Sequence, residues 1–401
     1  MKDKLKIGLV FGNLNVGGGS FQLLSLANVL VKNNDVTVFV YKDLTKGNYI
    51  NLKKNIKIIE ANKDKNNNSS IINSLFEPFI VSFGLAKLLL RYKYDILNPH
   101  EWPANWACSL VRLRRNVPIV WMCNDVWHLP NFSMEKRLRF KIFNNTFIKI
   151  TDLFLSLFLN RVIVLDNRIK KIVENYYHKK ATVIRSGIEI EDYKNVISKI
   201  DVRNKFKLDQ DKFIFICSSI FFLHRRFEDA IDAIKIIAKN NRKVQLIILG
   251  SSQFDPEYFK AIKNKINKEN LSKIVTVNNK FLPNDLFKAY IAASDVYIFP
   301  NEKQTWGLAV IEAMALGKPC IVSDGAGVHE IIKEEKNGLT FKCRDVKDLA
   351  GKMDKLINNE KLRIQVGKNA KEFVFSSYSW ENYADQMVKV FQETVSKKSS
   401  C

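Results

Sequence analysis

The sequence predicts an α/β protein built from two doubly wound, Rossmann-like domains. Short apolar segments of β-type composition alternate along the chain with longer segments of helical spacing, which is the pattern of parallel sheets covered by helices. Glycines or polar residues follow several of these strands, as expected for ligand-binding loops at the carboxyl edge of such a sheet. A length of 401 residues with 46% apolar composition is enough for two cores.

The first half of the chain supplies the elements of one domain. We expect strands at 5–11, 36–41, 119–123 and 161–165, and helices at 21–31 and 167–177. A glycine turn, Gly17-Gly18-Gly19, separates the first strand from the first helix and would let a phosphate or sugar approach the backbone. Its spacing matches neither G-x-G-x-x-G nor a P-loop, so no dinucleotide or nucleoside triphosphate site is predicted. The alternative is a purely structural turn.

His100 is the first candidate side chain for chemistry. It follows a strand that begins near Tyr94, in a loop that also carries Glu101, and a histidine at a strand end is well placed to meet a ligand. His128 lies in the polar segment after the next strand and is the weaker candidate, since a loop histidine is usually just solvated. A structural role remains the alternative for both.

The second half repeats the pattern. Strands are expected at 213–218, 244–250, 274–277, 296–299 and 320–323, a linker helix at 200–208, and later helices at 345–356, 360–375 and 378–395. Arg225 and Arg226 lie between the first of these strands and the helix that ends near Ala238. Two arginines at such a junction suit a diphosphate. Ion pairs with Glu228 and Asp229 are the alternative.

Residues 294–324 form a strand–loop–helix–strand unit around one unusual acid. Glu312 is the only charged residue in the apolar helix predicted at 308–316. A buried carboxylate is costly unless something pairs with it, so Glu312 either meets water or a salt bridge at the helix edge, or accepts hydrogen bonds from a ligand diol. The backbone N–H groups of residues 305–308 open the helix and would face a phosphate.

Composition and net charge limit which kinds of partner the protein can have. The formal charge is +23, which fits an anionic membrane surface, nucleic acid or a lysine-rich composition without a partner. No nucleic-acid-binding motif occurs, so we expect no nucleic-acid partner. The six cysteines show no metal-ligand spacing, which favours reduced thiols in a cytoplasmic protein. No segment is long and apolar enough for a signal peptide or a membrane span.

One segment links the positive charge to apolar side chains. Residues 132–158 interleave lysines and arginines with phenylalanines and leucines, and residues 75–94 show a similar mixture. A helical hairpin with a buried apolar face explains this pattern. The alternative is an amphipathic surface element that inserts into a membrane interface, in which case the protein is peripheral on the inner face of the membrane.

The unit at 294–324 resembles the motif of family-4 retaining glycosyltransferases, which have the GT-B fold. That motif has two glutamates separated by seven residues, and the second runs into Glu-Ala-Met-Ala and Gly-x-Pro, as Glu312 does here. The first acid falls on position 304, where this chain has Gln304. A charged role for that position therefore does not carry over. The resemblance implies two domains facing across a cleft, at 1–194 on the acceptor side and 195–372 for the nucleotide sugar, with a C-terminal helix at 373–401 returning to the first domain.

The resemblance also implies roles for individual residues. The sugar would be oriented by a histidine, the leaving diphosphate would be stabilised by the arginine pair and the helix N-terminus, the ribose held by Glu312, and the base stacked in the loop near 281. The implied catalytic residues are His100, Arg225, Arg226 and Gln304, and the implied donor-binding residues are Gly17, Gly18, Phe281, Leu282, Thr305, Trp306, Gly307, Leu308 and Glu312. No metal or other cofactor is implied.

The predicted activity is transfer of a hexose-type sugar from a UDP- or GDP-linked donor to a hydroxyl, with retention at the anomeric carbon. The acceptor implied by the resemblance is a cell-surface or lipid-linked glycan. Two other functions stay open. A nucleotide-sugar 2-epimerase would share the architecture but needs additional acid/base carboxylates, and a non-catalytic binding protein would explain Gln304 as a sign of lost activity.

Overall fold

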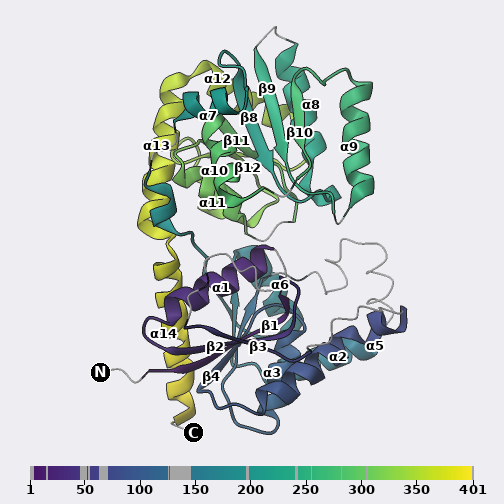
Figure 1. Cartoon of the computed structure of the whole chain (residues 1–401), viewed down its shortest axis with the longest axis vertical. Helices are drawn as coiled ribbons and strands as arrows, with labels where there is room; N and C mark the ends of the chain where they lie inside the picture. Colours follow the sequence, from purple (N-terminus) through teal and green to yellow (C-terminus); the bar gives the residue numbers. More distant parts are fainter. Residues whose placement is uncertain are drawn as a thin grey trace. The chain divides into compact units, whose positions relative to one another are not determined.

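The computed structural model describes residues 4–14, 17–45, 52, 55–62, 71–124, 126, 146–195, 198–239, 243–253, 255–280, 282–303 and 306–399. These residues form two compact units, which Figure 1 shows coloured along the chain. One unit comprises Met1–Ser186 with Trp380–Cys401, and the other comprises Gly187–Ser379.

The boundaries of the units lie at 186/187 and 379/380, whereas the sequence analysis placed them at 194/195 and 372/373. Backbone pairing explains the difference. The amide of Ile188 donates to the carbonyl oxygen of Tyr378 at 2.9 Å. A Cβ at Gly187 would lie only 2.3 Å from that same oxygen, so the two crossing segments touch backbone to backbone. Both segments therefore belong to the second unit, and the chain returns to the first unit only at Trp380.

The first unit is built on parallel strands. Four of them, β1 (Lys6–Leu14), β2 (Asp35–Asp43), β3 (Lys57–Glu60) and β4 (Ile96–Pro99), pair in the order β3-β2-β1-β4. Three more, β5 (Val120–Cys123), β6 (Arg161–Val164) and β7 (Ala181–Val183), pair in chain order. Parallel bridges Leu97–Ile119 and His100–Met122 join β4 to β5, so the two groups continue one another.

Helices cover both faces of these strands. They are α1 (Gly18–Leu30), α2 (Ile71–Leu89), α3 (Ala104–Arg112), α5 (Thr146–Ser156), α6 (Asn167–Tyr177) and α14 (Trp380–Ser399). The C-terminal α14 packs on α1, where the ring centroids of Phe21 and Trp380 lie 5.9 Å apart. Gln22 Nε2 also donates to the buried Tyr383 hydroxyl at 3.2 Å. The last helix is thereby part of the first unit.

The second unit has one sheet of six parallel strands. These are β8 (Phe213–Ser218), β9 (Val244–Leu249), β10 (Val275–Asn278), β11 (Val296–Phe299), β12 (Cys320–Ser323) and β13 (Leu339–Phe341), in the order β10-β9-β8-β11-β12-β13. Its helices are η1 (Ile190–Tyr193), α7 (Lys199–Lys205), η2 (Leu223–Arg225), α8 (Phe227–Ala238), α9 (Pro256–Lys268), α10 (Asn284–Ala293), α11 (Leu308–Ala315), η3 (Gly327–Ile331), α12 (Val346–Asn358) and α13 (Glu360–Ser377).

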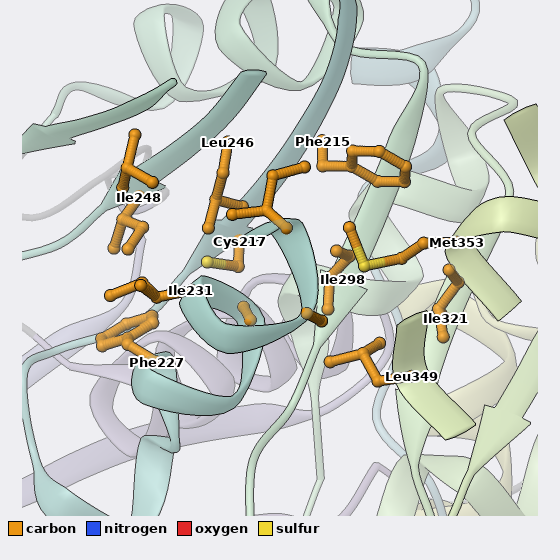
Figure 2. Close-up of a cluster of buried hydrophobic side chains, with 14 of the residues drawn as sticks. Phe215, Cys217, Phe227, Ile231, Leu246, Ile248, Ile298, Ile321, Leu349 and Met353 are labelled. Carbon is orange, nitrogen blue, oxygen red and sulfur yellow. The ribbon is translucent and has the colours of Figure 1, made fainter. Parts of the chain in front are cut away.

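The core of the second unit lies between its sheet and the helices α8 and α12. Figure 2 shows Phe215 and Cys217 of β8 facing Phe227 and Ile231 of α8. Leu246 and Ile248 of β9 extend this layer on one side of β8, and Ile298 of β11 and Ile321 of β12 extend it on the other side, toward α12. The strands are apolar on both faces, as expected for a parallel sheet covered by helices on each side.

Both units share one topological feature that matters for function. In each, the first strand lies beside the fourth, so β1 neighbours β4 and β8 neighbours β11. The chain leaves the first strand toward one side of the sheet and the fourth strand toward the other, so the strand order reverses between them. Ligands of doubly wound folds bind at this point. We therefore expect ligands at the loops after β1, β4, β8 and β11.

The cysteines in the described part of the chain are free thiols, namely Cys108, Cys123, Cys217, Cys320 and Cys343.

None of the helices in the described part of the chain combines the length and the apolar character that crossing a lipid bilayer requires.

A buried arginine fixes the amino edge of the second sheet. Arg203 of α7 is 2% exposed, and its Nε donates to the carbonyl oxygen of Ala293 at 2.9 Å. Its Nη1 donates to the carbonyl oxygens of Gln210 and Lys212, both at 3.0 Å, and its Nη2 pairs with Asp295 Oδ2 at 2.8 Å. One guanidinium thus joins α7, the segment before β8, and the segment before β11.

We expect Arg203→Met to lower the free energy of unfolding of the second unit by about 3–5 kcal/mol, because it removes a buried guanidinium from the Asp295 carboxylate, which keeps Lys199 and the Ile214 amide, and leaves several carbonyls without their donor. Urea denaturation followed by the fluorescence of Trp306, the tryptophan of this unit, would measure the loss. Arg344→Met is the matched control, since Arg344 makes an exposed ion pair with Glu302 and should change stability by less than about 1 kcal/mol. Equal effects of the two substitutions would contradict the role given to Arg203.

Candidate functional site

The loops at the carboxyl edge of the second sheet are tied to one another by backbone hydrogen bonds. The amide of Glu302, after β11, donates to the carbonyl oxygen of His224, after β8, at 2.8 Å. The next amide, of Lys303, donates to the carbonyl oxygen of Gly325, after β12, at 2.9 Å. Three loops from three neighbouring strands thereby form one continuous surface beside the switch point.

Asn301 and Arg225 form the contact at the centre of this surface. Asn301 is buried, and with its amide oriented to satisfy both groups, Oδ1 accepts from Arg225 Nη1 at 3.1 Å. The Asn301 Nδ2 atom donates to the backbone oxygen of Arg225 at 3.2 Å. The side chain of one loop therefore holds both the guanidinium and the backbone of the other. Asn301 was not predicted as a site residue from the sequence.

Arg225 is a cation without a carboxylate partner among the described residues. Its Nε atom is buried and has no hydrogen-bond partner, and no described carboxylate lies within ion-pair distance. Burial lowers its pKa to about 10, so the group stays charged at neutral pH. A buried cation without a counter-charge lowers the stability of the fold, and a bound anion would offset that loss.

Arg226 is different, although it is the next residue. Its backbone is left-handed, with φ of 53°, which turns the side chain onto the first turn of α8. Its Nε and Nη2 atoms donate to the Asp229 carboxylate at 3.0 and 2.6 Å, and Nη1 lies 2.7 Å from Glu228 Oε1. The structure therefore shows for Arg226 the ion pairs that were the alternative in the sequence analysis. The uncompensated cation of the pair is Arg225.

Glu312 projects from the second turn of α11 and is half-buried. Burial raises its pKa to about 7, while a hydrogen bond from the Tyr193 hydroxyl and the charge of Lys288 act in the opposite direction. It is thus a carboxyl group that is costly to ionise and yet has a donor and a cation arranged around it. The two groups that favour the ionised form, Tyr193 on η1 and Lys288 on α10, are far from Glu312 in sequence.

The N-terminus of α11 begins at a tightly enclosed glycine. A Cβ at Gly307 would lie 3.0 Å from Val328 Cγ1 and 3.1 Å from the Phe299 ring. Trp306 is buried, with its ring centroid 5.8 Å from that of Tyr378, so its side chain belongs to the core. Among the described residues at this helix start, the backbone amides of Gly307 and the half-buried Leu308 are the groups that face a ligand. Gln304 and Thr305 lie outside the described residues.

The loop expected to stack a nucleotide base is described only in part. Leu282 is half-buried and lies between β10 and α10, at the outer side of the same carboxyl edge. Phe281 lies outside the described residues. His128 of the first unit also lies outside them.

The first unit gathers a second set of polar groups at its own switch point. Gly17 caps α1 in an extended conformation, and a Cβ at Gly18 would meet no atom within 4 Å. His100 directly follows β4 and is fully buried, with Nε2 2.9 Å from Asn98 Oδ1. Burial lowers its pKa to about 3, so the imidazole is neutral, and its Nδ1 atom has no hydrogen-bond partner.

Two asparagines that the sequence analysis did not name complete this set. The parallel registers of β1 with β4 and of β4 with β5 place Asn13, His100 and Asn124 on the same face of the sheet. Asn13 Oδ1 and both amide atoms of Asn124 are buried without a partner. A Cβ at Gly19 would lie 3.7 Å from Asn124 Nδ2, so the first turn of α1 adjoins the group. A neutral, hydroxyl-rich ligand would satisfy such groups.

The arrangement in the second unit has a definite chemical capacity. A buried guanidinium and the N-terminus of α11 offer positive charge to a diphosphate, and Glu312 offers hydrogen-bond acceptors to a diol. Within the described residues, no three histidine, cysteine, aspartate or glutamate side chains are grouped so that they could hold a metal ion.

Comparisons with known proteins identify the family. Residues 16–192 match the family model described as Glycosyltransferase Family 4, and residues 198–373 match the model described as Glycosyl transferases group 1. Among curated proteins, the chain is 24% identical over 331 residues to the UDP-Gal:alpha-D-GlcNAc-diphosphoundecaprenol alpha-1,3-galactosyltransferase of Escherichia coli, covering 81% of this chain and 82% of that protein.

Solved structures show the same fold. Sucrose-phosphate synthase from Thermosynechococcus elongatus superposes with a TM-score of 0.82 at 18% identity, covering 97% of this chain and 99% of that one. Anabaena HepE in complex with UDP and glucose superposes with a TM-score of 0.77 at 18% identity, with the same coverage. The two consecutive family matches span both units, and the chain belongs to the family-4 glycosyltransferases with the GT-B fold.

Proposed function

We propose that the protein transfers a hexose from a UDP- or GDP-linked donor to a hydroxyl of a cell-surface or lipid-linked glycan, with retention at the anomeric carbon. The observation that carries this proposal is the uncompensated Arg225, held by Asn301 in the segment that runs from β11 to α11, with Glu312 on that helix. The name of the Escherichia coli relative, which includes a UDP-sugar and a diphosphoundecaprenol acceptor, supports the choice of donor and acceptor class. The UDP bound to Anabaena HepE supports the nucleotide.

In the proposed reaction, the bond between the anomeric carbon and the β-phosphate oxygen breaks while the acceptor oxygen bonds to that carbon from the same face. The acceptor's proton passes to the departing phosphate oxygen, so no separate base is needed. Negative charge develops on the diphosphate, and the proposal assigns its stabilisation to Arg225, which Asn301 holds in place, and to the amides at the start of α11. This charge stabilisation is assigned to the protein's own groups, without a metal ion.

The first unit would bind the sugar hydroxyls and the acceptor. Its neutral His100 can donate or accept a hydrogen bond at Nδ1, depending on which ring nitrogen carries the proton. The unpaired amide groups of Asn13 and Asn124 provide further donors and acceptors on the same face. Gln304 would meet the donor sugar with a neutral amide, where the family pattern has a carboxylate.

The first unit also presents an apolar surface, which we call the α2–α5 surface. The rings of Phe79 on α2 and Phe147 on α5 stack with centroids 5.7 Å apart, so the two helices are adjacent. Large apolar side chains at helical spacing are exposed at 44–65% on both helices and directly after α5. They are Phe76, Ile80 and Phe83 on α2, Phe147, Ile150 and Phe154 on α5, and Leu157 after it. Lys87 and Lys149 are exposed on the same helices.

We propose that the α2–α5 surface binds an anionic membrane, where a lipid-linked acceptor would be found. The exposed aromatic and aliphatic side chains match the apolar acyl region of a bilayer, and the lysines beside them match its anionic headgroups. The N-terminal part of the basic segment, residues 132–145, lies outside the described residues. Its membrane role stays a prediction from the sequence.

Glu312→Gln should weaken binding of the nucleoside diphosphate by about 1.5–3 kcal/mol, because it removes a charged acceptor from the ribose diol. Calorimetric titration with UDP and with GDP would measure this. Glu360→Gln is the matched control, since Glu360 is exposed at the start of α13 and pairs with Arg363. Unchanged affinity of a folded Glu312→Gln protein would remove the ribose contact from the proposal.

Arg225→Met should reduce the rate of donor turnover by about a hundredfold or more, because a fixed cation no longer meets the developing charge. The rate of nucleoside diphosphate release reports this, with circular dichroism as the check on folding. The control is Arg344→Met, which removes an exposed guanidinium from the same loop region and should leave turnover within about twofold. Activity of Arg225→Met within a few-fold of wild type would place the diphosphate elsewhere.

The protein should co-sediment with vesicles that contain phosphatidylglycerol and not with vesicles of phosphatidylcholine alone, since each basic side chain near an anionic bilayer contributes about 1 kcal/mol. The double substitution Phe83→Ser and Phe154→Ser should abolish the part of the binding that resists salt. Ile364→Ser is the control, because Ile364 is equally exposed, at 63%, but lies on α13 of the second unit. A protein that stays in the supernatant at low salt would indicate a soluble acceptor instead.

A further inference from the structure

Asn301 is a buried asparagine that follows β11 and contacts the loop after β8. It is 1% exposed, and its Oδ1 atom accepts a hydrogen bond from Arg225 Nη1 at 3.1 Å. Its Nδ2 atom donates to the backbone oxygen of Arg225 at 3.2 Å. The amide of the next residue, Glu302, donates to the carbonyl oxygen of His224 at 2.8 Å, which joins the same two loops a second time. One side chain therefore holds Arg225 at both its guanidinium and its backbone.

The carboxylates closest in sequence to these two loops are paired with other cations. The two acids in the first turn of α8 lie 2.6 and 2.7 Å from the guanidinium of Arg226. Glu302 lies 2.7 Å from Arg344 Nη2. Among the described residues, Arg225 has no carboxylate within ion-pair distance, and its Nε atom has no hydrogen-bond partner. The side chain that holds this cation is thus a neutral amide.

The residue type at position 301 determines how much of the Arg225 charge is available to a ligand. An aspartate has nearly the same shape as an asparagine, but it would give the guanidinium a counter-charge. A bound anion would then compete with that carboxylate. An amide supplies a hydrogen-bond acceptor and a donor without any charge. Arg225 is half-buried, so the held guanidinium is not closed off from solvent.

We propose that Asn301 is a positioning residue that holds the Arg225 guanidinium in place for the diphosphate of the donor and leaves its positive charge uncompensated. This inference rests on the proposed function, in which Arg225 binds that diphosphate. The amide oxygen fixes the guanidinium, and the amide nitrogen fixes the backbone that carries it. The cation is therefore already in position when negative charge develops on the diphosphate, which is the condition for strong electrostatic stabilisation.

The experiment is calorimetric titration of UDP, GDP, uridine and inorganic pyrophosphate into wild type, Asn301→Ala and Asn301→Asp. Asn301→Ala should weaken binding of the nucleoside diphosphate about tenfold, because the guanidinium is no longer held. Asn301→Asp should weaken it about a hundredfold, because a carboxylate now pairs with the guanidinium. Pyrophosphate affinity should fall in the same order, whereas affinity for uridine, which has no phosphate, should not change. A purely structural role of Asn301 predicts the reverse order, since aspartate is closer to asparagine in shape.

A double-mutant cycle tests whether Asn301 acts through Arg225. A residue that acts through a second one loses its effect when the second is removed. In the Arg225→Met background, Asn301→Ala should therefore change nucleoside diphosphate affinity by less than about twofold. Thermal unfolding checks that each variant is folded, and Asn301→Ser takes the place of Asn301→Ala if that variant unfolds.

Asn337→Asp is the matched control. Asn337 is 3% exposed, its Oδ1 atom accepts from the Lys333 amide at 2.6 Å, and its Nδ2 atom donates to the carbonyl oxygen of Ile331 at 3.1 Å. It thus also holds a loop, but it lies just before β13, at the amino edge of the same sheet. The substitution introduces the same charge into a buried amide site and should leave nucleoside diphosphate affinity within about twofold of wild type.

The outcomes separate this inference from the proposed function. If Asn301→Asp binds as tightly as Asn301→Ala or more tightly, or if Asn301→Ala costs the same affinity with and without Arg225, the positioning role is refuted. The proposed function then stands as long as Arg225→Met binds the diphosphate weakly. If Arg225→Met binds as wild type does, the diphosphate contact itself is refuted, and this inference with it.

Discussion

The position of the first strand beside the fourth in each sheet is the constraint on which the candidate sites depend. It places the loop after β8 against the loop after β11, where Asn301 holds Arg225 through both guanidinium and backbone. In the first unit, the same neighbourhood of β1 and β4 sets His100 on the same face of the sheet as Asn13 at the end of β1. Residues far apart in the chain become neighbours because parallel strands all end at one edge.

Environment, rather than residue type, then decides what each charged group can do. Arg225 and Arg226 are adjacent in sequence, but the left-handed backbone at Arg226 directs its side chain to Glu228 and Asp229 and leaves Arg225 without a described carboxylate. Burial at Glu312 is offset by Tyr193 and Lys288 instead of by a salt bridge on its own helix. The proposed function assigns the one cation to a diphosphate and the acid to a diol.

Much of the fold could be predicted from the sequence. The strands 213–218, 296–299 and 320–323 coincide with β8, β11 and β12, because each is a continuous apolar run bounded by polar residues or proline. The helix 167–177 coincides with α6, whose start is fixed by the Asp166 side chain accepting from the Ile169 amide. The site was only partly predictable. Glu312 was identifiable as a lone charge in an apolar helix, but the groups that favour its ionised form, and the choice between the two arginines, depend on tertiary contacts and on one backbone angle.

Donor turnover tests the central claim most directly. Purified protein would be incubated with a panel of UDP-hexoses and GDP-hexoses, with and without extracted membrane glycolipids, and free nucleoside diphosphate would be quantified over time. The account predicts release of UDP or GDP from at least one donor, faster when acceptor is present. A folded protein that binds these nucleotides but releases no diphosphate from any donor, with or without glycolipid, would contradict it and would indicate a binding protein on a transferase fold.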